Sequence, residues 1–180
     1  PGREGPRTAM DHSPAAAFSP LSADSCGLER MEIGAEVDWL PDCLVSDPWL
    51  EHVPFAFWLM KVLDPRRVVE LGMEGGASFA AFCQAAERLD RDTRCHAIAH
   101  LPGDRPAGAA GTQGFAAGRA WPPARWRTVS AVHRMPGGAA RAMFQDGEVD
   151  LLHIDGRQEY EAGLAAFRCW RGAVSDRGAV

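Results

Sequence analysis

The chain has 180 residues, of which 46% are hydrophobic and 24% are charged, and this composition is typical of a single soluble globular domain. Acidic residues outnumber basic ones by 24 to 19, so the formal net charge of −5 gives no basic surface for nucleic acid or an anionic membrane. No apolar run approaches the ~18 residues of a membrane-spanning helix, and no signal peptide is visible. The five cysteines form no closely spaced pair, which favours free thiols over a zinc site or a disulfide framework. These features predict a cytoplasmic protein without a nucleic-acid partner.

The first part of the chain, residues 1–46, is expected to form a disordered or loosely ordered arm. Pro, Gly, Ala, Ser and acidic residues follow one another there without a sustained period. Order is expected to begin at Asp47 and Pro48, which suit the N-cap and the first position of a helix. Residues 49–62 are apolar almost all round a helix, which Pro54 should kink or restart. The folded domain is therefore predicted to span residues 47–180.

From residue 67 onward, strand and helix patterns alternate. Strands are expected at residues 67–71, 94–100, 126–133 and 149–155, with a fifth starting at 178–180, and helices at 78–89, 139–144 and 159–171. The last helix is expected to bury Tyr160, Leu164, Phe167 and Trp170. Residues 102–123 are rich in Gly, Ala and Pro and are expected to form a disordered loop. The alternation predicts an α/β fold, a Rossmann-like parallel sheet with helices on both faces.

The turn at residues 72–76 follows the first expected strand, where open parallel sheets bind their ligands. Gly72 would let the backbone approach a ligand closely, and Gly76 would let the next helix begin against the strand. The glycine spacing misses the dinucleotide-binding fingerprint, and Glu70 and Glu74 would repel a pyrophosphate. An acidic residue at this place suits a cationic or hydroxyl-rich ligand, and the amino and sulfonium groups of S-adenosylmethionine meet that description.

Asp155 ends the fourth expected strand and should reach the same cleft as Gly72. Its carboxylate could hold a divalent metal ion or position a substrate hydroxyl, and the alternative is that it only caps the following turn or helix. His153 lies inside the strand, and we interpret it as a sheet histidine rather than a catalytic base.

Two separated segments resemble a bacterial family of class I S-adenosylmethionine-dependent methyltransferases whose members often accompany glycosyltransferases. One segment comprises residues 68–72, 76–78 and 81–85, and the other comprises residues 151–156 and 160–162. The likeness runs from about residue 49 to residue 180 and implies a seven-stranded sheet. Because Val180 falls in the fifth strand, we expect only about the first five strands and a domain incomplete at its C-terminus.

The resemblance also implies roles for individual residues. Those that match the family's cofactor turn are Glu70, Gly72, Gly76 and Ser78. Asp155 is the implied catalytic residue, orienting the acceptor hydroxyl or binding the divalent ion. The implied acceptor is a small molecule or glycan, and association with glycosyltransferase domains is implied as well.

Three positions depart from the family pattern. Ala99 stands where the family has an acidic residue that binds the ribose hydroxyls. Gln158 replaces a histidine that is the family's candidate base, and glutamine cannot take a proton. Residues 135–138 offer no side-chain acceptor near the adenine position.

These observations leave three hypotheses in order. The first is a methyltransferase that methylates a hydroxyl oxygen of a sugar, glycan or small molecule. The second, motivated by the three departures, is a catalytically degenerate methyltransferase-like binding or scaffold domain. The third is a nucleotide-sugar or dinucleotide binder, which the glycine spacing disfavours.

Overall fold

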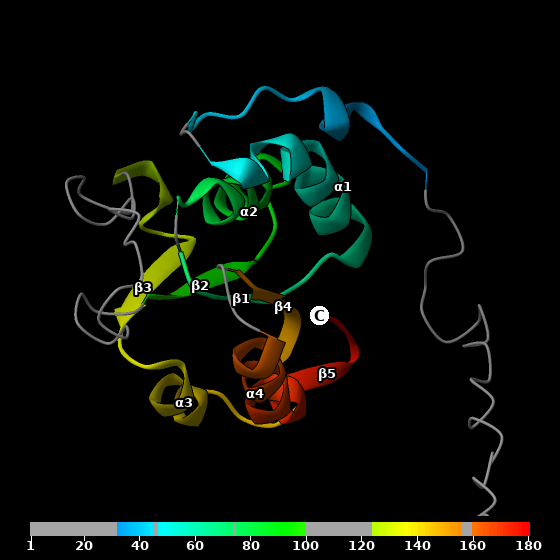
Figure 1. The fold of residues 1–180 in the computed structure, drawn as a ribbon. Helices are drawn as coiled ribbons and strands as arrows, with labels where there is room; N and C mark the ends of the chain where they lie inside the picture. The colour runs from blue at the N-terminus through cyan, green and yellow to red at the C-terminus, as the bar shows by residue number, and fades with distance from the viewer. Residues whose placement is uncertain (1–31, 45–46, 74, 100–123, 156–159) are drawn as a thin grey trace, which may run out of the picture. The chain divides into compact units, whose positions relative to one another are not determined.

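The computed structural model describes residues 32–44, 47–73, 75–99, 124–155 and 160–180, all within the compact unit Met31–Val180. Five parallel strands form one sheet in the order β3-β2-β1-β4-β5 (Figure 1). Their bounds are Arg67–Leu71 for β1, Arg94–Ala99 for β2, Ser130–Arg134 for β3, Val149–Ile154 for β4 and Val174–Ala179 for β5.

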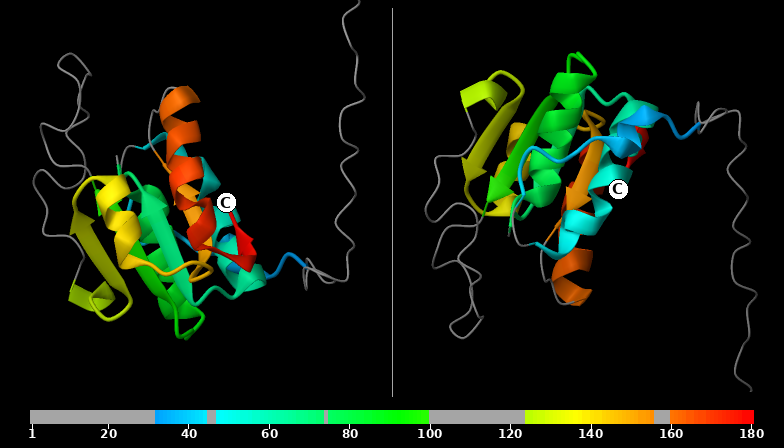
Figure 2. Two further views of the ribbon diagram at one scale, coloured as in Figure 1. Left: turned by 90° about the horizontal axis from the view of Figure 1, so that it is seen from below. Right: turned by 90° about the horizontal axis from the view of Figure 1, so that it is seen from above.

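Helices cover both faces of this sheet, as Figures 1 and 2 show. Helices α1 (Val53–Leu63) and α2 (Ala77–Arg88) lie on one face, and α3 (Gly137–Ala140) and α4 (Tyr160–Trp170) lie on the other. Short 3-10 helices are formed by Ala35–Asp38, Pro48–His52, Ala124–Trp126, Arg141–Met143 and Arg171–Ala173. The predicted fold class, a Rossmann-like α/β sheet, is confirmed.

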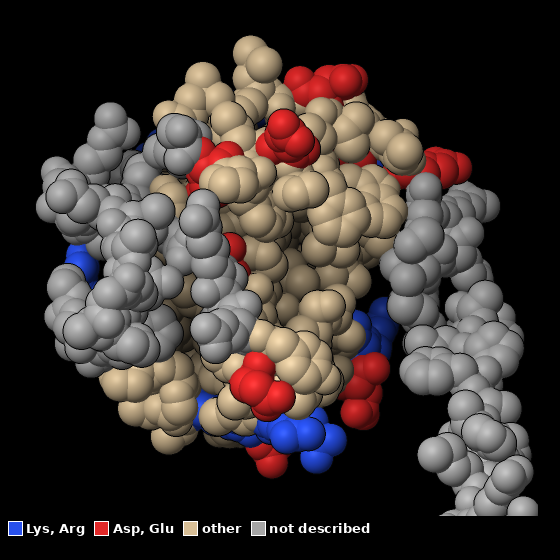
Figure 3. Space-filling model, viewed as in Figure 1, with Lys and Arg blue, Asp and Glu red and all other residues tan. Residues whose placement is uncertain are grey.

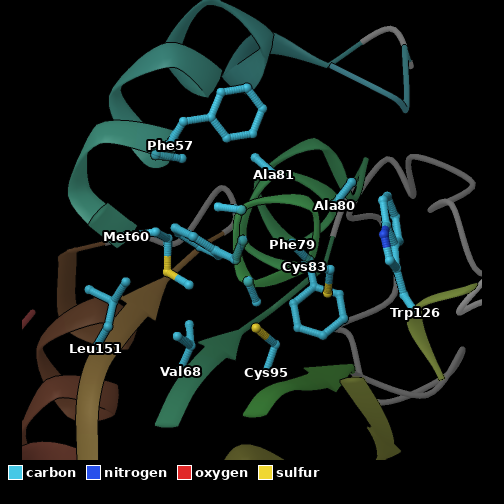
Figure 4. Packing of buried hydrophobic residues seen from close by; sticks show 14 of the residues in the cluster. Phe57, Met60, Val68, Phe79, Ala80, Ala81, Cys83, Cys95, Trp126 and Leu151 are labelled. Atoms are coloured by element: carbon cyan, nitrogen blue, oxygen red, sulfur yellow. The ribbon is translucent and has the colours of Figure 1, made fainter. Parts of the chain in front are cut away.

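Each face of the sheet has its own apolar core. On the α1/α2 side, bulky residues of both helices pack on β1, β2 and β4 (Figure 4); the buried members include Phe57, Met60, Val68, Phe79, Cys83, Cys95 and Leu151. The opposite core contains Val69, Ile98, Phe144, Leu152 and Trp170. The side chains of β1 alternate between two buried faces, and the strand is therefore apolar from residue 68 to residue 71 except for Glu70.

The start of the folded domain follows the predicted capping pattern. The Asp47 Oδ1 atom accepts a hydrogen bond from the Trp49 backbone N–H at 2.9 Å, and Pro48 opens the 3-10 helix that follows. This short helix leads into α1, where Pro54 occupies the first turn. A proline is tolerated there because the first-turn N–H groups have no partner inside the helix. The predicted restart at Pro54 is confirmed.

Residues 32–44, which the sequence pattern assigns to the loose arm, pack against α1 and α2. The Gln84 side chain donates to the Leu40 carbonyl and accepts from the Asp42 N–H, both at 2.8 Å. The Trp39 ring lies 5.5 Å from that of Phe57, and Glu36 is buried with an ion pair to Lys61. The predicted start of the folded domain at residue 47 is therefore too late. Residues 32–44 pack on helices that are distant in the sequence, and a local sequence pattern does not show such contacts. Residues 1–31 and the predicted loop at 102–123 lie outside the described residues.

Several element boundaries also differ from expectation. The third strand begins at Ser130, because Trp126 instead ends a 3-10 helix and is only 1% exposed. The helix expected at 139–144 is split into α3 and a 3-10 turn. The fifth strand begins at Val174, four residues before its expected start at residue 178. Val149 pairs with Val174 and Leu151 with Ala179, so β5 contains a bulge.

Helix α4 buries less of its apolar face than its periodicity predicts. Of its four expected core residues only Trp170 is buried, while Tyr160 is 78% exposed and Phe167 is 39% exposed. The Trp170 indole N–H donates to the Gly137 carbonyl at 3.2 Å and fixes the end of the helix to α3. The beginning of α4 extends past the sheet (Figure 2), which leaves Tyr160 without a layer to pack on in the described part of the chain.

Candidate functional site

The candidate site lies where the strand order of the sheet reverses. β1 pairs with β2 on one side and β4 on the other, so the connections leaving β1 and β4 diverge to opposite faces. Open parallel sheets bind ligands at the carboxyl ends of strands beside such a point. Leu71 pairs with Ile154, which brings the next residues, Gly72 and Asp155, side by side.

Gly72 is held between two strands. Its N–H donates to the Ile98 carbonyl at 3.0 Å, and the Asp155 N–H donates to the Leu71 carbonyl at 2.8 Å. Gly72 has a φ of 97°, and a Cβ added to it would lie 2.5 Å from the Asp155 carbonyl oxygen. The backbone after β4 therefore lies too close to position 72 for any residue but glycine. This reason is separate from the close approach of a ligand that the sequence predicts.

The start of α2 carries two more predicted site residues. Gly76 is the N-cap with a φ of 81°, and it provides no side chain to cap the helix. Ser78 is 1% exposed in the first turn, and its Oγ has no well-aligned hydrogen-bond partner among the described residues, although it lies close enough to Glu70 to lower the pKa of that carboxyl. Gly72, Gly76 and Ser78 thus lie at the turn between β1 and α2, and Asp155 lies against Gly72.

Asp47 also contacts this turn, a position that the sequence pattern does not predict. Its Oδ2 accepts a hydrogen bond from the Ala77 N–H at 3.3 Å, at the N-terminus of α2. A Cβ added at Gly75 would collide with the same carboxylate oxygen. The sequence pattern identifies Asp47 only as the N-cap of the 3-10 helix Pro48–His52. Its contact with Ala77, thirty residues away, leaves no local sequence pattern.

Glu70 and His153 form a buried pair at the carboxyl ends of β1 and β4. The His153 Nδ1 lies 3.0 Å from the Glu70 Oε2, and the Glu70 side chain is fully buried. The rings of Trp49 and Phe82 contact His153 edge-on at 5.3 and 5.5 Å. His153 is thus held as a sheet histidine, as the sequence suggested, but its carboxylate partner was not foreseen.

Both members of this pair have shifted pKa values. Burial raises the pKa of Glu70, and the nearby Asp155 charge adds to this, while the hydrogen bond and charge of His153, together with Ser78, only partly offset it. For His153, burial works against protonation, but the hydrogen bond and charge of Glu70 outweigh it and raise the pKa, with help from Asp155. The pair therefore favours a proton held between β1 and β4.

The turn has unused hydrogen-bonding capacity that suits a polar ligand. Glu70 Oε1 and Ser78 Oγ are both buried, and neither has a hydrogen-bond partner among the described residues. Such groups are rare because an unsatisfied buried polar atom costs about 1–3 kcal/mol. The two atoms come from the residues that the turn connects, so an amino, hydroxyl or water donor bound at the turn would satisfy them.

The departures from the family pattern lie at the edges of this site. Ala99 ends β2 and is 6% exposed, and it offers no acceptor for a ribose hydroxyl. Residues 135–138, which follow β3 and include the first two residues of α3, carry no polar side chain. Gln158, the predicted replacement of the family's histidine, lies outside the described residues.

The surface over the carboxyl ends of the strands is hollowed. Figure 3 shows a recess between the α1/α2 half of the molecule and α4, with few charged side chains on its walls. In the described segments, no group of three or more His, Cys, Asp or Glu residues could hold a metal ion. None of the described helices has the length and apolar character needed to cross a membrane.

A second histidine pair lies on the opposite face of the sheet. His96 and His133 are stacked, with the His96 Nδ1 at 3.1 Å from the His133 Nε2. Burial, followed by the charges of His133, Arg67 and Arg94, lowers the pKa of His96 to about 4. The two arginines make this place unfavourable for a cation, and the pair belongs to the packing around Phe144.

Fold and site together define a class I methyltransferase type of domain, with the glycine turn after β1 and an acidic residue after β4. Residues 69–180 match the family described as a methyltransferase domain, and the chain belongs to this family.

Two known proteins show how far the similarity extends. The uncharacterized protein y4gI of Sinorhizobium fredii is 39% identical over 132 residues, which cover 73% of this chain and 14% of that protein. The crystal structure of a putative caffeoyl-CoA O-methyltransferase from Staphylococcus aureus superposes with a TM-score of 0.52 at 15% identity, over 80% of this chain and 59% of that one. The chain thus spans about a seventh of the curated relative, and the structural likeness concerns the fold.

Proposed function

We propose that this chain is an S-adenosylmethionine-dependent methyltransferase domain that transfers a methyl group to a hydroxyl oxygen of a small molecule or glycan. The observation that carries the proposal is the turn between β1 and α2, where Glu70 Oε1 and Ser78 Oγ are buried and unsatisfied within the described residues. Membership of the methyltransferase domain family supports the reaction class. The glycan acceptor and an association with glycosyltransferase domains rest on the sequence resemblance alone.

The residues at the turn have distinct roles in this proposal. Gly72 and Gly76 keep the backbone free of side chains where the cofactor would lie, and Glu70 and Ser78 would bind its polar groups. When bound, S-adenosylmethionine supplies a methyl group on a positively charged sulfonium. The Asp155 carboxylate, whose charge acts on Glu70 as well, favours that cation at the carboxyl ends of β1 and β4.

Asp155 is the proposed catalytic residue because its backbone lies against Gly72. There its carboxylate would accept a hydrogen bond from the acceptor hydroxyl and orient the oxygen for attack on the methyl group. A divalent ion at Asp155 is not included in this proposal. Cys83, Cys95 and Cys169 are free thiols, which supports a reducing, cytoplasmic setting.

Calorimetry on the 180-residue chain tests the proposal. We expect S-adenosylmethionine and its demethylated product, S-adenosylhomocysteine, to bind with heat, weakly because Ala99 supplies no ribose acceptor. Transfer of a labelled methyl group to a panel of sugars and phenols would then identify the acceptor class. Absence of binding by both ligands at millimolar concentration would contradict the proposal.

The variant Ala99→Asp is expected to strengthen the binding of S-adenosylhomocysteine roughly 10-fold, because one buried hydrogen bond to a charged group contributes about 1.5–3 kcal/mol before desolvation of the new side chain is subtracted. The same titration measures this gain. Ala97→Asp is the control. Ala97 lies two residues earlier on β2 and is fully buried, so an aspartate there should not strengthen the binding of S-adenosylhomocysteine. An unchanged affinity in Ala99→Asp would mean that the ribose is held elsewhere.

A further inference from the structure

We propose that Asp47 is a further cofactor-binding residue, whose carboxylate on the turn between β1 and α2 receives the ammonium group of S-adenosylmethionine. This inference rests on the proposed function and deepens it. It assigns a role to a residue that precedes the methyltransferase match at residues 69–180.

The geometry places the Asp47 carboxylate directly on the glycine turn. One oxygen, Oδ1, is occupied by the Trp49 N–H at 2.9 Å, and the other, Oδ2, accepts from the Ala77 N–H at the longer distance of 3.3 Å. Oδ2 also lies so close to Gly75 that a side chain there would collide with it. The carboxylate is thus fixed at one end and held against the turn at the other.

The charge at the turn decides whether the ammonium or the carboxylate of the cofactor's methionine moiety can bind there. The N-terminus of α2 attracts anions, and Asp47 already supplies one. A cofactor carboxylate would meet that charge and would have to displace it. An ammonium group, in contrast, is attracted by the Asp47 carboxylate. The turn therefore selects the cationic group of the zwitterion.

The unsatisfied buried atoms point independently to a bound polar group. Glu70 Oε1 and Ser78 Oγ lie on the two elements that the turn joins, and neither atom has a well-aligned hydrogen-bond partner among the described residues. Residues 47–49 also lie near Glu70, because the Trp49 ring contacts His153, which is the hydrogen-bond partner of Glu70. An ammonium has three donors, so it can bond Asp47 and a further acceptor at the turn at once.

The test compares two ligands that differ only at the amino acid end. S-adenosylhomocysteine carries the ammonium and the carboxylate, whereas 5′-methylthioadenosine keeps the adenosine and the thioether sulfur without them. In calorimetry on the full chain, Asp47→Asn is expected to weaken the binding of S-adenosylhomocysteine roughly tenfold, the loss of one charge-assisted hydrogen bond, and to leave methylthioadenosine unchanged. Asp47→Ser, which keeps an N-cap for Trp49, should give the same selective loss.

Asp42→Asn is the matched control. Asp42 is an acidic residue of the same N-terminal region, but it pairs with Arg88 and Arg125 instead of the turn. Its replacement should change the affinity of neither ligand, and thermal unfolding verifies that all variants are folded.

Three outcomes would overturn the assignment while leaving the proposed function intact. Tighter binding of S-adenosylhomocysteine by Asp47→Asn would show that Asp47 blocks the turn. An equal loss for both ligands would show a structural role, and no change for either would show no contact. If the unmodified chain binds neither ligand, the proposed function itself fails, and the assignment fails with it.

Discussion

Replacing His153 with alanine is expected to lower the free energy of unfolding by about 3–5 kcal/mol, the range typical for removing one partner of a buried ion pair. Glu70 is fully buried, and its Oε2 would lose its partner at 3.0 Å. Its Oε1 already has no partner among the described residues, so the carboxylate would be left without a hydrogen bond to them. Urea unfolding followed by circular dichroism measures the loss.

A double variant separates the pair from simple loss of packing. Glu70→Gln combined with His153→Ala removes the buried charge and should recover part of the stability lost in His153→Ala alone. His52→Ala, at an exposed position, is the control and should stay within about 0.5 kcal/mol of the unmodified chain. Equal losses in His153→Ala and in the double variant would contradict a role for the ion pair.

The same pair predicts how stability depends on pH. Because the pKa of His153 is raised above its ordinary value of 6.5, its contribution is fully present below that value and is lost as the pH rises through the raised pKa. Glu70 acts in the same direction, since its raised pKa means that ionisation above 4.5 costs stability in the folded state. The unmodified chain should therefore lose stability as the pH rises above 4.5. His153→Ala should lose more over the same range, because Glu70 then lacks the hydrogen bond and charge that lower its pKa.

Gly72→Ala is expected to destabilise the fold by about 1–3 kcal/mol, because the φ of 97° is a backbone conformation that alanine rarely adopts. The added Cβ would lie 2.5 Å from the Asp155 carbonyl oxygen, which belongs to backbone and cannot move without shifting the end of β4. Since that shift also displaces the turn, the affinity for S-adenosylhomocysteine should fall roughly tenfold or more. Thermal unfolding and calorimetry on the same sample measure the two effects.

Gly163→Ala is the matched control for this variant. Gly163 lies within α4, and a Cβ added there meets no atom within 4 Å. Alanine in a helix should stabilise the chain by about 0.5–1 kcal/mol and leave ligand binding unchanged. A Gly72→Ala variant as stable as Gly163→Ala would contradict the tight contact between β1 and β4.

Much of the fold follows from local patterns in the sequence. The first strand has the predicted bounds, and the Asp47-Pro48 cap and the restart at Pro54 occur where the residues indicate. The proximity of Gly72 and Asp155 was predictable too, because the carboxyl ends of parallel strands meet at one sheet edge.

Contacts between distant residues were not predictable in the same way. The bond between Asp47 and Ala77, the partnership of Glu70 with His153, and the packing of residues 32–44 join elements whose spacing carries no signal. Helix α4 shows the opposite failure, since its apolar period predicts a buried Tyr160 that the structure leaves exposed. Periodicity indicates which residues share a face, but not how far the neighbouring layer extends.

The strand order has a consequence for folding kinetics. β1 obtains its second neighbour only when β4 arrives, and Glu70 and His153 are 83 positions apart in the chain. Closing a connection of that length costs entropy before its contacts form, so high contact order should make completion of the turn a late event in folding. During synthesis, the Gly72 turn therefore stays open until the chain has been made as far as Asp155. A ligand that binds the finished turn would then act on refolding chiefly by slowing the reverse reaction, since it stabilises contacts absent from the transition state.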